Sequence, residues 1–256
     1  MRLSEIKGFE VKHFLMAKFT SKEWVHSFLE GIIYMNNFKH FIDQEKASKV
    51  KGQGDAYEGA HVLEVSDIKI YDQQNRLVGT AELGNLIERY EGVNRIPMFC
   101  VANFSTRDFV VLEQTEDRIR IKLEIPSEDV LRIKEVFNAD TVALTLSPHI
   151  FIERFKKAAE KSDMGLAYGM VDYADYRILS DARRASFDEG EVDFLFTKHD
   201  SLAYQKEFRF ILTNVETEVP ITVNVGNLKD IFIQMNIDDF LTGTFLDMNI
   251  KIIEDD

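Results

Sequence analysis

The most constraining feature of the sequence is a strict alternation of charged and apolar side chains over residues 118–125, which read Arg-Ile-Arg-Ile-Lys-Leu-Glu-Ile. Successive side chains of a β-strand point to opposite faces, so this period of two predicts a strand with one buried and one wet face. Wet faces are typical of antiparallel sheets, because parallel sheets are covered on both sides. The alternation therefore predicts an antiparallel sheet.

Other short runs rich in β-branched and aromatic residues also predict strands, and they do not alternate regularly with helices. Helices are predicted after Ser21, with Trp24 in the buried stripe, over residues 38–44, and after Ser147, where proline takes the first helical position. Together these elements predict one α+β domain over residues 1–256. The further predicted strands cover residues 13–16, 32–35, 67–71, 77–83, 97–104, 141–146, 169–179, 192–196, 206–212 and 221–225.

Composition narrows the class of protein. A chain of 256 residues with 45% hydrophobic side chains is long enough to bury a sizeable core. Its 31 basic and 44 acidic residues give a net charge of −13, which argues against stable DNA binding. No apolar stretch is long enough to cross a membrane, and we expect the acidic residues 254–256 to form a solvated tail.

The single cysteine, Cys100, excludes an internal disulfide framework and favours the cytoplasm as the compartment. We interpret it as a buried thiol in a strand. No two of the six histidines have metal-ligand spacing, so no metal site is predicted. Phosphate-loop, dinucleotide-fingerprint and serine-nucleophile motifs are absent as well.

The candidate site lies late in the chain. If residues 205–211 form a strand, Gln205, Glu207 and Arg209 share one face, while the two intervening phenylalanines point into the core. A carboxylate beside an amide can bind ribose hydroxyls, and such a carboxylate can stabilise an oxocarbenium-like transition state. The alternative is an ordinary wet sheet face that carries an exposed pair of Glu207 and Arg209.

The segment from Gln205 to Glu207 resembles the Gln/Glu-x-Glu signature of ADP-ribosyltransferases, in which the last Glu holds the nicotinamide ribose. The wider pattern is similar to a bacterial family of uncharacterised phage-defence proteins with a late Tyr-(Glu/Gln)-x-Glu-aromatic-Arg motif, a pattern also expected for toxins of toxin–antitoxin–chaperone systems. Here that motif is Tyr204 to Arg209, preceded by Phe-Thr-Lys ending at Lys198. The likeness spans residues 12–212.

Two earlier segments also resemble this family, namely Gly-Ile-Ile-Tyr-Met-Asn over residues 31–36 and Gly-Asp-Ala-Tyr-Glu-Gly over residues 54–59. The chain departs from the family at Gln53, where an arginine is expected before the second segment.

The resemblance implies a split or strongly bent, mainly antiparallel sheet with flanking helices and a cleft that holds NAD. It implies transfer of ADP-ribose to a macromolecular acceptor, RNA or protein, with release of nicotinamide and without a metal. Glu207 would be the catalytic carboxylate, and Gln205 would orient the ribose or the acceptor. A toxin of this kind implies an antitoxin or chaperone as partner.

The resemblance also suggests residues that contact NAD. Tyr34 would pack on nicotinamide, with His26 as a weaker choice, and Arg209 would secure Glu207 or a phosphate. Residues 54–59 have two interpretations, either an NAD-binding or target-binding loop or a plain turn. The expected NAD-binding residues are Tyr34, Asn36, Asp55, Tyr57 and Arg209.

Two other functions stay open from the sequence. The first is an NAD glycohydrolase that uses the same site with water as the acceptor. The second is a non-catalytic acidic interaction protein, such as an inhibitor or a decoy whose charge mimics nucleic acid. A decoy requires a continuous exposed acidic patch, whereas the enzyme requires a hollow beside Gln205 and Glu207.

Overall fold

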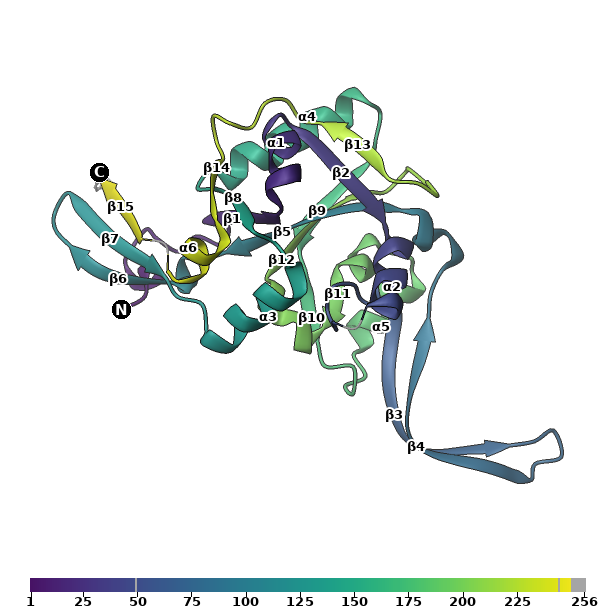
Figure 1. Ribbon diagram of the computed structural model, residues 1–256. Helices are drawn as coiled ribbons and strands as arrows, with labels where there is room; N and C mark the ends of the chain where they lie inside the picture. The colour runs from purple at the N-terminus through teal and green to yellow at the C-terminus, as the bar shows by residue number, and fades with distance from the viewer. Residues whose placement is uncertain (49, 244, 250–256) are drawn as a thin grey trace.

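The computed structural model describes residues 1–48, 50–243 and 245–249 (Figure 1), so the predicted acidic tail lies outside the described residues. It has a single-domain α+β architecture. The helices and 3-10 turns are η1 (Leu3–Glu5), α1 (Lys22–Leu29), α2 (Phe38–Ala47), η2 (Glu91–Arg95), η3 (Thr106–Asp108), α3 (Ser127–Phe137), α4 (Pro148–Lys161), α5 (Asp181–Asp188), η4 (Val192–Phe196), η5 (Asp200–Gln205) and α6 (Ile237–Leu241).

Antiparallel pairing dominates the sheets, as the alternation predicted. The strands are β1 (Leu15–Thr20), β2 (Ile32–Asn37), β3 (His61–Tyr71), β4 (Leu77–Glu88), β5 (Pro97–Phe104), β6 (Phe109–Gln114), β7 (Arg118–Leu123), β8 (Thr141–Thr145), β9 (Leu166–Met170), β10 (Asp172–Ala174), β11 (Thr197–His199), β12 (Glu207–Leu212), β13 (Ile221–Asn224), β14 (Ile233–Asn236) and β15 (Phe245–Asn249).

The main sheet forks at its central strand, β5. One edge of β5 pairs with β12 over residues 98–102. Met98 also pairs with Asn36 of β2, and Ala102 also pairs with Ala17 of β1, so β1 and β2 must both lie on the other edge of β5. Between these two contacts, residues 99–101 of β5 have no strand beside them on that edge. The predicted split in the sheet is therefore present.

Each side of the fork carries further strands. β13 extends the side that begins with β2, and β8 and β14 extend the side that begins with β1. The helix α1 connects β1 to β2 along the chain and so links the two sides. Beyond β12, the strand β9 forms the opposite edge of the sheet.

The two faces of the sheet have different surroundings. Phe208 and Phe210 point into an aromatic core with Phe151 and Phe155 of α4, as expected from their spacing. On the reverse face, Glu207 and its strand neighbours pack toward α2, α5 and η4. Aromatic packing on one face therefore fixes the residues that β12 presents on the other.

Two smaller sheets stand apart from the main one in Figure 1. β7 pairs with β6 and β15, and its residues alternate between exposed and buried, which confirms the predicted wet face. β3 and β4 form a long hairpin that projects from the body and bends midway. This hairpin begins earlier and ends later than the sequence predicts.

Several local predictions are wrong. Trp24 is 62% exposed, because Val25, Phe28 and Leu29 already fill the buried side of α1. Residues 192–196 form the 3-10 helix η4, and the consecutive buried side chains of Phe194, Leu195 and Phe196 produce the same apolar run as a strand. The predicted strand over residues 169–179 is instead two shorter strands, β9 and β10, that end at Ala174.

Candidate functional site

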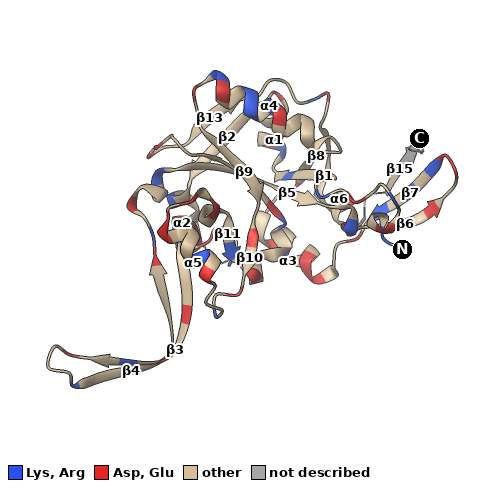
Figure 2. Ribbon diagram, turned by 180° about the vertical axis from the view of Figure 1, so that it is seen from behind, with Lys and Arg blue, Asp and Glu red and all other residues tan. Residues whose placement is uncertain are grey.

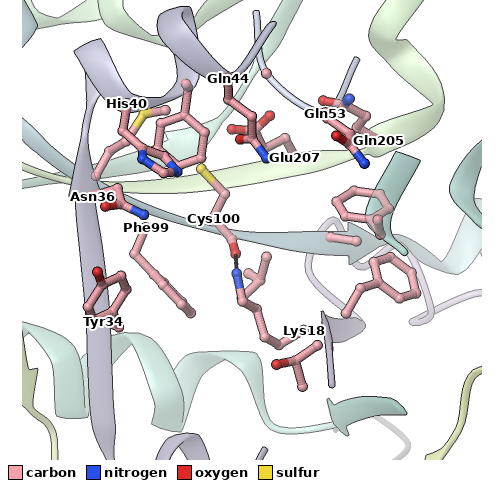
Figure 3. Close-up of a pocket in the computed structure, with 18 of the residues that line it drawn as sticks. Lys18, Tyr34, Asn36, His40, Gln44, Gln53, Phe99, Cys100, Gln205 and Glu207 are labelled. Atoms are coloured by element: carbon pink, nitrogen blue, oxygen red, sulfur yellow. Dashed lines mark hydrogen bonds between the residues drawn. The ribbon is translucent and has the colours of Figure 1, made fainter. Parts of the chain in front are cut away.

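Gln205 and Glu207 flank a single strained residue. Gln205 ends η5, Lys206 has a left-handed backbone with φ of 48°, and Glu207 begins β12, so the expectation that Gln205 lies on the strand is wrong. Such a φ is uncommon for a residue with a side chain. Both side chains nevertheless reach one cavity of about 810 Å³, shown in Figure 3.

Lys198 of β11 joins the two side chains. Its Nζ donates hydrogen bonds to Oε1 of Gln205 at 2.9 Å and to Oε2 of Glu207 at 2.8 Å. The amide nitrogen of Gln205 donates to the carbonyl of Gly52 at 2.9 Å. Because both ends of the amide are held, its orientation beside the carboxylate is fixed.

A second cation lies on the other side of the carboxylate. Arg209 is fully buried, and its Nε donates to Oε1 of Glu207 at 2.7 Å. Its Nη2 donates to Glu58 at 2.8 Å, and Nζ of Lys198 lies 3.1 Å from the same carboxylate. Glu58, Lys198, Glu207 and Arg209 thus form a closed set of two acids and two bases, which we call the buried quartet.

The charges of the buried quartet offset the cost of burial. Desolvation alone would raise the pKa of Glu207, but Arg209 and Lys198 outweigh it and hold that pKa well below its usual value. Desolvation would lower the pKa of Lys198, yet Glu207 and Glu58 keep it above its usual value. Lys198, Glu207 and Arg209 are therefore ionised at neutral pH. The exposed surface pair considered from the sequence is not what forms, because Glu207 and Arg209 are both buried.

Glu207 keeps capacity for a ligand. Each of its two oxygens accepts one hydrogen bond from a cation of the quartet. The Cys100 thiol forms a further hydrogen bond to this carboxylate. A carboxylate offers about four acceptor positions, so about one remains on the side chain that lines the cavity. Its backbone N–H donates to the hydroxyl of Tyr173 at 2.9 Å, which fixes the start of β12 from behind.

The cavity lies at the fork in the sheet. β1, β2 and β5 supply its floor, and α1, α2, the end of α3 and residues 52–54 complete its walls. Its volume falls within the range of roughly 300–1,000 Å³ that is typical of small-molecule and cofactor sites. Many aromatic side chains line the cavity, and they are Phe19, Trp24, Phe28, Tyr34, Phe41, Phe99 and Phe137.

Lys18 occupies the gap of the fork. Its Nζ donates a hydrogen bond to the carbonyl of Cys100 at 2.9 Å, and this carbonyl belongs to the part of the β5 edge that has no neighbouring strand. The same Nζ lies 4.5 Å from the ring centre of Phe99. Burial lowers the pKa of Lys18. No carboxylate within the described ranges forms an ion pair with this ammonium, which leaves it available to an anionic ligand.

The expected NAD-binding residues divide into two groups. Tyr34 and Asn36 of β2 line the cavity, on the opposite side from Gln205 in Figure 3. Tyr34 is 57% exposed, so its ring is accessible. His26 lies on the exposed side of α1, 3.8 Å from Glu30, and does not line the cavity.

Asp55, Tyr57 and Arg209 do not line the cavity. Arg209 secures Glu207 but is enclosed, so it is not placed to meet a phosphate. The Tyr57 hydroxyl accepts a hydrogen bond from Asn85, and its ring packs edge-on against Tyr176.

Asp55 is buried and accepts a hydrogen bond from the Tyr57 backbone N–H at 2.8 Å. That bond is the local turn interaction considered from the sequence. Burial and the charge of Glu58 raise the pKa of Asp55 to about 6. The loop of residues 52–59 contributes to the site through other positions, namely the Gly52 carbonyl and Glu58.

Cys100 lies in β5 as predicted, and it lines the cavity beside Glu207. Burial and the charge of Glu207 raise its pKa well above the usual value, so it is a neutral thiol. Among the described residues, no three His, Cys, Asp or Glu side chains are placed to hold a metal ion.

The roles of four residues did not follow from the sequence. Lys198 and Glu58 stood within quoted motifs, but nothing in the local sequence indicates that Glu58 meets Arg209, 151 positions away. Lys18 had a signal, because it is the one charged residue in the apolar run of residues 14–19. Trp24 was assigned to the core rather than to the cavity wall.

Comparison with known proteins returned no relative: no protein-family model, no curated protein and no solved structure matches this chain. The helices in the described part of the chain are all too short or too polar to cross a membrane.

Proposed function

We propose that this protein is an NAD-dependent ADP-ribosyltransferase that transfers ADP-ribose to RNA or protein and releases nicotinamide. One observation carries the proposal. Gln205 and Glu207, held in fixed orientation by Lys198, line an aromatic cavity of about 810 Å³ at the fork of the sheet.

The walls of the cavity suit the parts of a dinucleotide. Its exposed aromatic side chains offer stacking surfaces for flat rings, with Tyr34 placed for nicotinamide. The ammonium of Lys18 offers a charge for the diphosphate. Glu207 and Gln205 offer acceptors and a donor for ribose hydroxyls.

The mechanism follows from the charge state of Glu207. Its low pKa keeps it a carboxylate, which accepts a hydrogen bond from a hydroxyl of the nicotinamide ribose. The bond between ribose C1′ and the nicotinamide nitrogen breaks, and its electron pair leaves with nicotinamide. The carboxylate stabilises the positive charge that develops on the ribose. The acceptor then forms a bond to C1′ and releases a proton.

The acidic decoy has less support. Figure 2 shows Asp and Glu interspersed with Lys and Arg along the helices and loops. Many of these acids have basic partners, among them Asp230 with Arg154 and Glu216 with Arg95. In the described part of the chain, acidic and basic residues are therefore mixed along the same elements.

Incubation of the purified protein with labelled NAD and total cellular RNA or lysate tests the proposal. We expect wild type to label a macromolecule and Glu207→Gln to lose at least about a hundredfold in rate. Glu58→Gln serves as the matched variant, because it removes the same charge from the buried quartet but leaves the carboxylate beside Gln205 in place. Rates are compared per folded molecule, measured by circular dichroism.

Three results have distinct meanings. Free ADP-ribose without labelled polymer assigns the site to an NAD glycohydrolase. Equal rates for wild type and Glu207→Gln remove Glu207 from the mechanism. No consumption of NAD under any condition contradicts an NAD-dependent enzyme altogether.

We further propose that the activity is toxic to the cell that makes the protein, with an antitoxin or chaperone as partner. Induced expression of wild type is then expected to arrest growth, while Glu207→Gln is expected to be tolerated at the same protein level. Arrest by both variants would separate toxicity from the site.

A further inference from the structure

A second cavity, of about 770 Å³, lies behind the residues that carry the candidate site. Gln205 and Glu207 line the first cavity, whereas Lys206 between them lines the second. Tyr173, whose hydroxyl accepts a hydrogen bond from the Glu207 backbone N–H, lines it as well. The volume of the second cavity is in the range of small-molecule sites, and the proposed function makes no use of it.

One wall of the second cavity is the segment that precedes β1, and hydrogen bonds fasten this segment to the end of β5 and to η3. The Asn103 amide donates to the Lys12 carbonyl at 3.0 Å, and the Thr106 hydroxyl donates to the Val11 carbonyl at 3.2 Å. The Val11 backbone N–H donates to the same hydroxyl at 3.1 Å. The backbone of this wall is therefore fixed by the fold.

The charged residues that line the second cavity divide into one neutralised pair and three unpaired groups. Lys206 forms an ion pair with Asp108 at 2.7 Å. Lys12, Arg107 and Glu10 form no ion pair in the part of the chain that the structure describes. Two unpaired cations against one unpaired acid leave the cavity with a local positive charge, in a protein whose net charge is −13.

Side-chain donors in the second cavity are free for a ligand. The Tyr173 hydroxyl accepts from Glu207, but its own hydrogen has no acceptor among the described residues. The side chains of Lys12 and Arg107 add unpaired donors, and neither side chain can accept a hydrogen bond. A negatively charged group with several acceptor oxygens complements these donors in both charge and hydrogen bonding.

We propose that the second cavity binds a small molecule that carries an oxyanion, either a phosphate or a carboxylate, through Lys12, Arg107 and the Tyr173 hydroxyl. The size of the cavity suits a small molecule. The proposal does not rest on the proposed function, because none of these three residues lines the cavity that would hold NAD.

A ligand in the second cavity acts on the candidate site through Tyr173. A hydroxyl that donates its own hydrogen becomes a stronger acceptor, because hydrogen bonds in a chain polarise one another. An oxyanion that accepts from Tyr173 therefore strengthens the hydrogen bond from the Glu207 N–H to the same hydroxyl. Occupancy of the second cavity thus fixes the backbone that presents Glu207 to the first cavity.

Isothermal titration calorimetry with inorganic phosphate and with citrate tests the binding and separates the two sources of the oxyanion. The double variant Lys12→Gln with Arg107→Gln loses two charged donors, so we expect its dissociation constant for the bound probe to rise at least about tenfold. Glu10→Gln removes the unpaired acid and is expected to lower that constant about twofold. The matched control, Lys7→Gln with Lys161→Gln, removes two positive charges outside the cavity and is expected to change it less than about twofold.

Hydrogen exchange followed by NMR locates the bound probe. We expect the probe to slow exchange of the Glu207 amide hydrogen by about threefold or more, and Tyr173→Phe to show no such slowing. Lys18→Met changes only the proposed NAD cavity, so it is expected to keep the full effect and to separate this site from that cavity.

Three results would overturn the proposal. The first is that neither phosphate nor citrate binds at about 10 mM. The second is that the double variant Lys12→Gln with Arg107→Gln binds the probe as tightly as its matched control. The third is that a bound probe leaves exchange of the Glu207 amide hydrogen unchanged.

Discussion

At the scale of single residues, the buried quartet links the candidate catalytic carboxylate to the stability of the fold. Lys198 and Arg209 are both buried, and each contacts Glu58 and Glu207. Removing one member of a buried ion set leaves an uncompensated charge, which is strongly destabilising. Positions that fix Glu207 are therefore also positions on which folding depends.

Lys198→Met tests this dependence. Two carboxylates would then share one arginine, so we expect the free energy of unfolding to fall by about 3–5 kcal/mol. Lys206→Met is the matched control, because that lysine is partly exposed and forms an ion pair with Asp108 outside the quartet. Its loss is expected to be under about 1 kcal/mol. Urea denaturation measures both, and equal losses would contradict the coupling within the quartet.

Asp55 makes the stability of the fold depend on pH, and the direction of that dependence follows from its raised pKa. Its folded-state pKa of about 6 lies above the ordinary value of 3.8, so the folded state binds the proton more tightly between these two values. Stability should therefore fall as pH rises from about 4 to about 6, by about 3 kcal/mol from this group. Above that range Asp55 is charged, and its buried charge lowers the free energy of unfolding by this constant amount.

Asp55→Asn removes that cost while it keeps the oxygen that accepts from the Tyr57 backbone. We expect the variant to be more stable than wild type at pH 7.5 and equal to it at pH 4. Thermal unfolding at the two pH values provides the measurement. A variant that is less stable at pH 7.5 would show that the charged carboxylate has a favourable partner.

At the scale of elements, the loop of residues 52–59 is held against α2 by a close backbone approach. A Cβ atom on Gly54 would lie 2.0 Å from the Phe41 carbonyl and 2.6 Å from the Glu45 backbone nitrogen. Backbone cannot yield as a flexible side chain can, so only glycine fits this contact. The same loop supplies the Gly52 carbonyl to Gln205 and Glu58 to the quartet.

Gly54→Ala should therefore displace the loop and disturb both contacts. We expect a stability loss of about 2 kcal/mol or more, together with reduced turnover of NAD. Gly92→Ala is the control, because its nearest neighbour, a Glu216 side-chain oxygen, lies at an ordinary 3.6 Å. Comparable behaviour of the two alanine variants, in unfolding and in NAD turnover, would mean that the loop tolerates movement.

Elements whose side chains repeat with a clear period could be predicted from the sequence. The alternation was sufficient to predict β7, and the proline at the first helical position was sufficient to predict the start of α4. Phe208 and Phe210 point into the core as expected. The 3-10 helix η4 could not be distinguished from a strand, because its consecutive apolar residues are all buried. Helix α3 was missed, since polar residues cover most of its surface.

The candidate site could be predicted only in part, for a similar reason. Gln205 and Glu207 stand close together in the chain, and a local motif suffices to pair them. Gln205 bonds to Gly52, which is 153 positions away, and Glu58 joins the quartet through Lys198 and Arg209. Such long-range contacts leave no periodic signal in the sequence. Asp55 and Tyr57 lie in the same loop as those partners, but they face away from the cavity.

At the scale of the whole molecule, the fork in the sheet determines where a ligand can bind. β1 and β2 separate along β5, and the gap exposes the Cys100 carbonyl, to which Lys18 binds. A ligand in this gap contacts both sides of the fork at once. Binding there should therefore stabilise the entire fold rather than one segment.

A thermal-shift measurement with NAD tests this consequence. At a ligand concentration of about 100 times its dissociation constant, we expect about 2.7 kcal/mol of added stability and a clear rise in Tm. Lys18→Met should keep the fold, because Lys18 has no carboxylate partner to leave unpaired among the described residues. The same variant should lose most of the NAD-dependent rise. An equal rise in both proteins would place the ligand elsewhere.

The most direct measurement is a crystal structure of the protein with a non-hydrolysable NAD analogue. We expect the ribose next to nicotinamide to lie within hydrogen-bond distance of Glu207 and Gln205, with the diphosphate near Lys18 and the nicotinamide against Tyr34. A dinucleotide bound away from the fork, or a cavity that stays empty at saturating analogue, would contradict it.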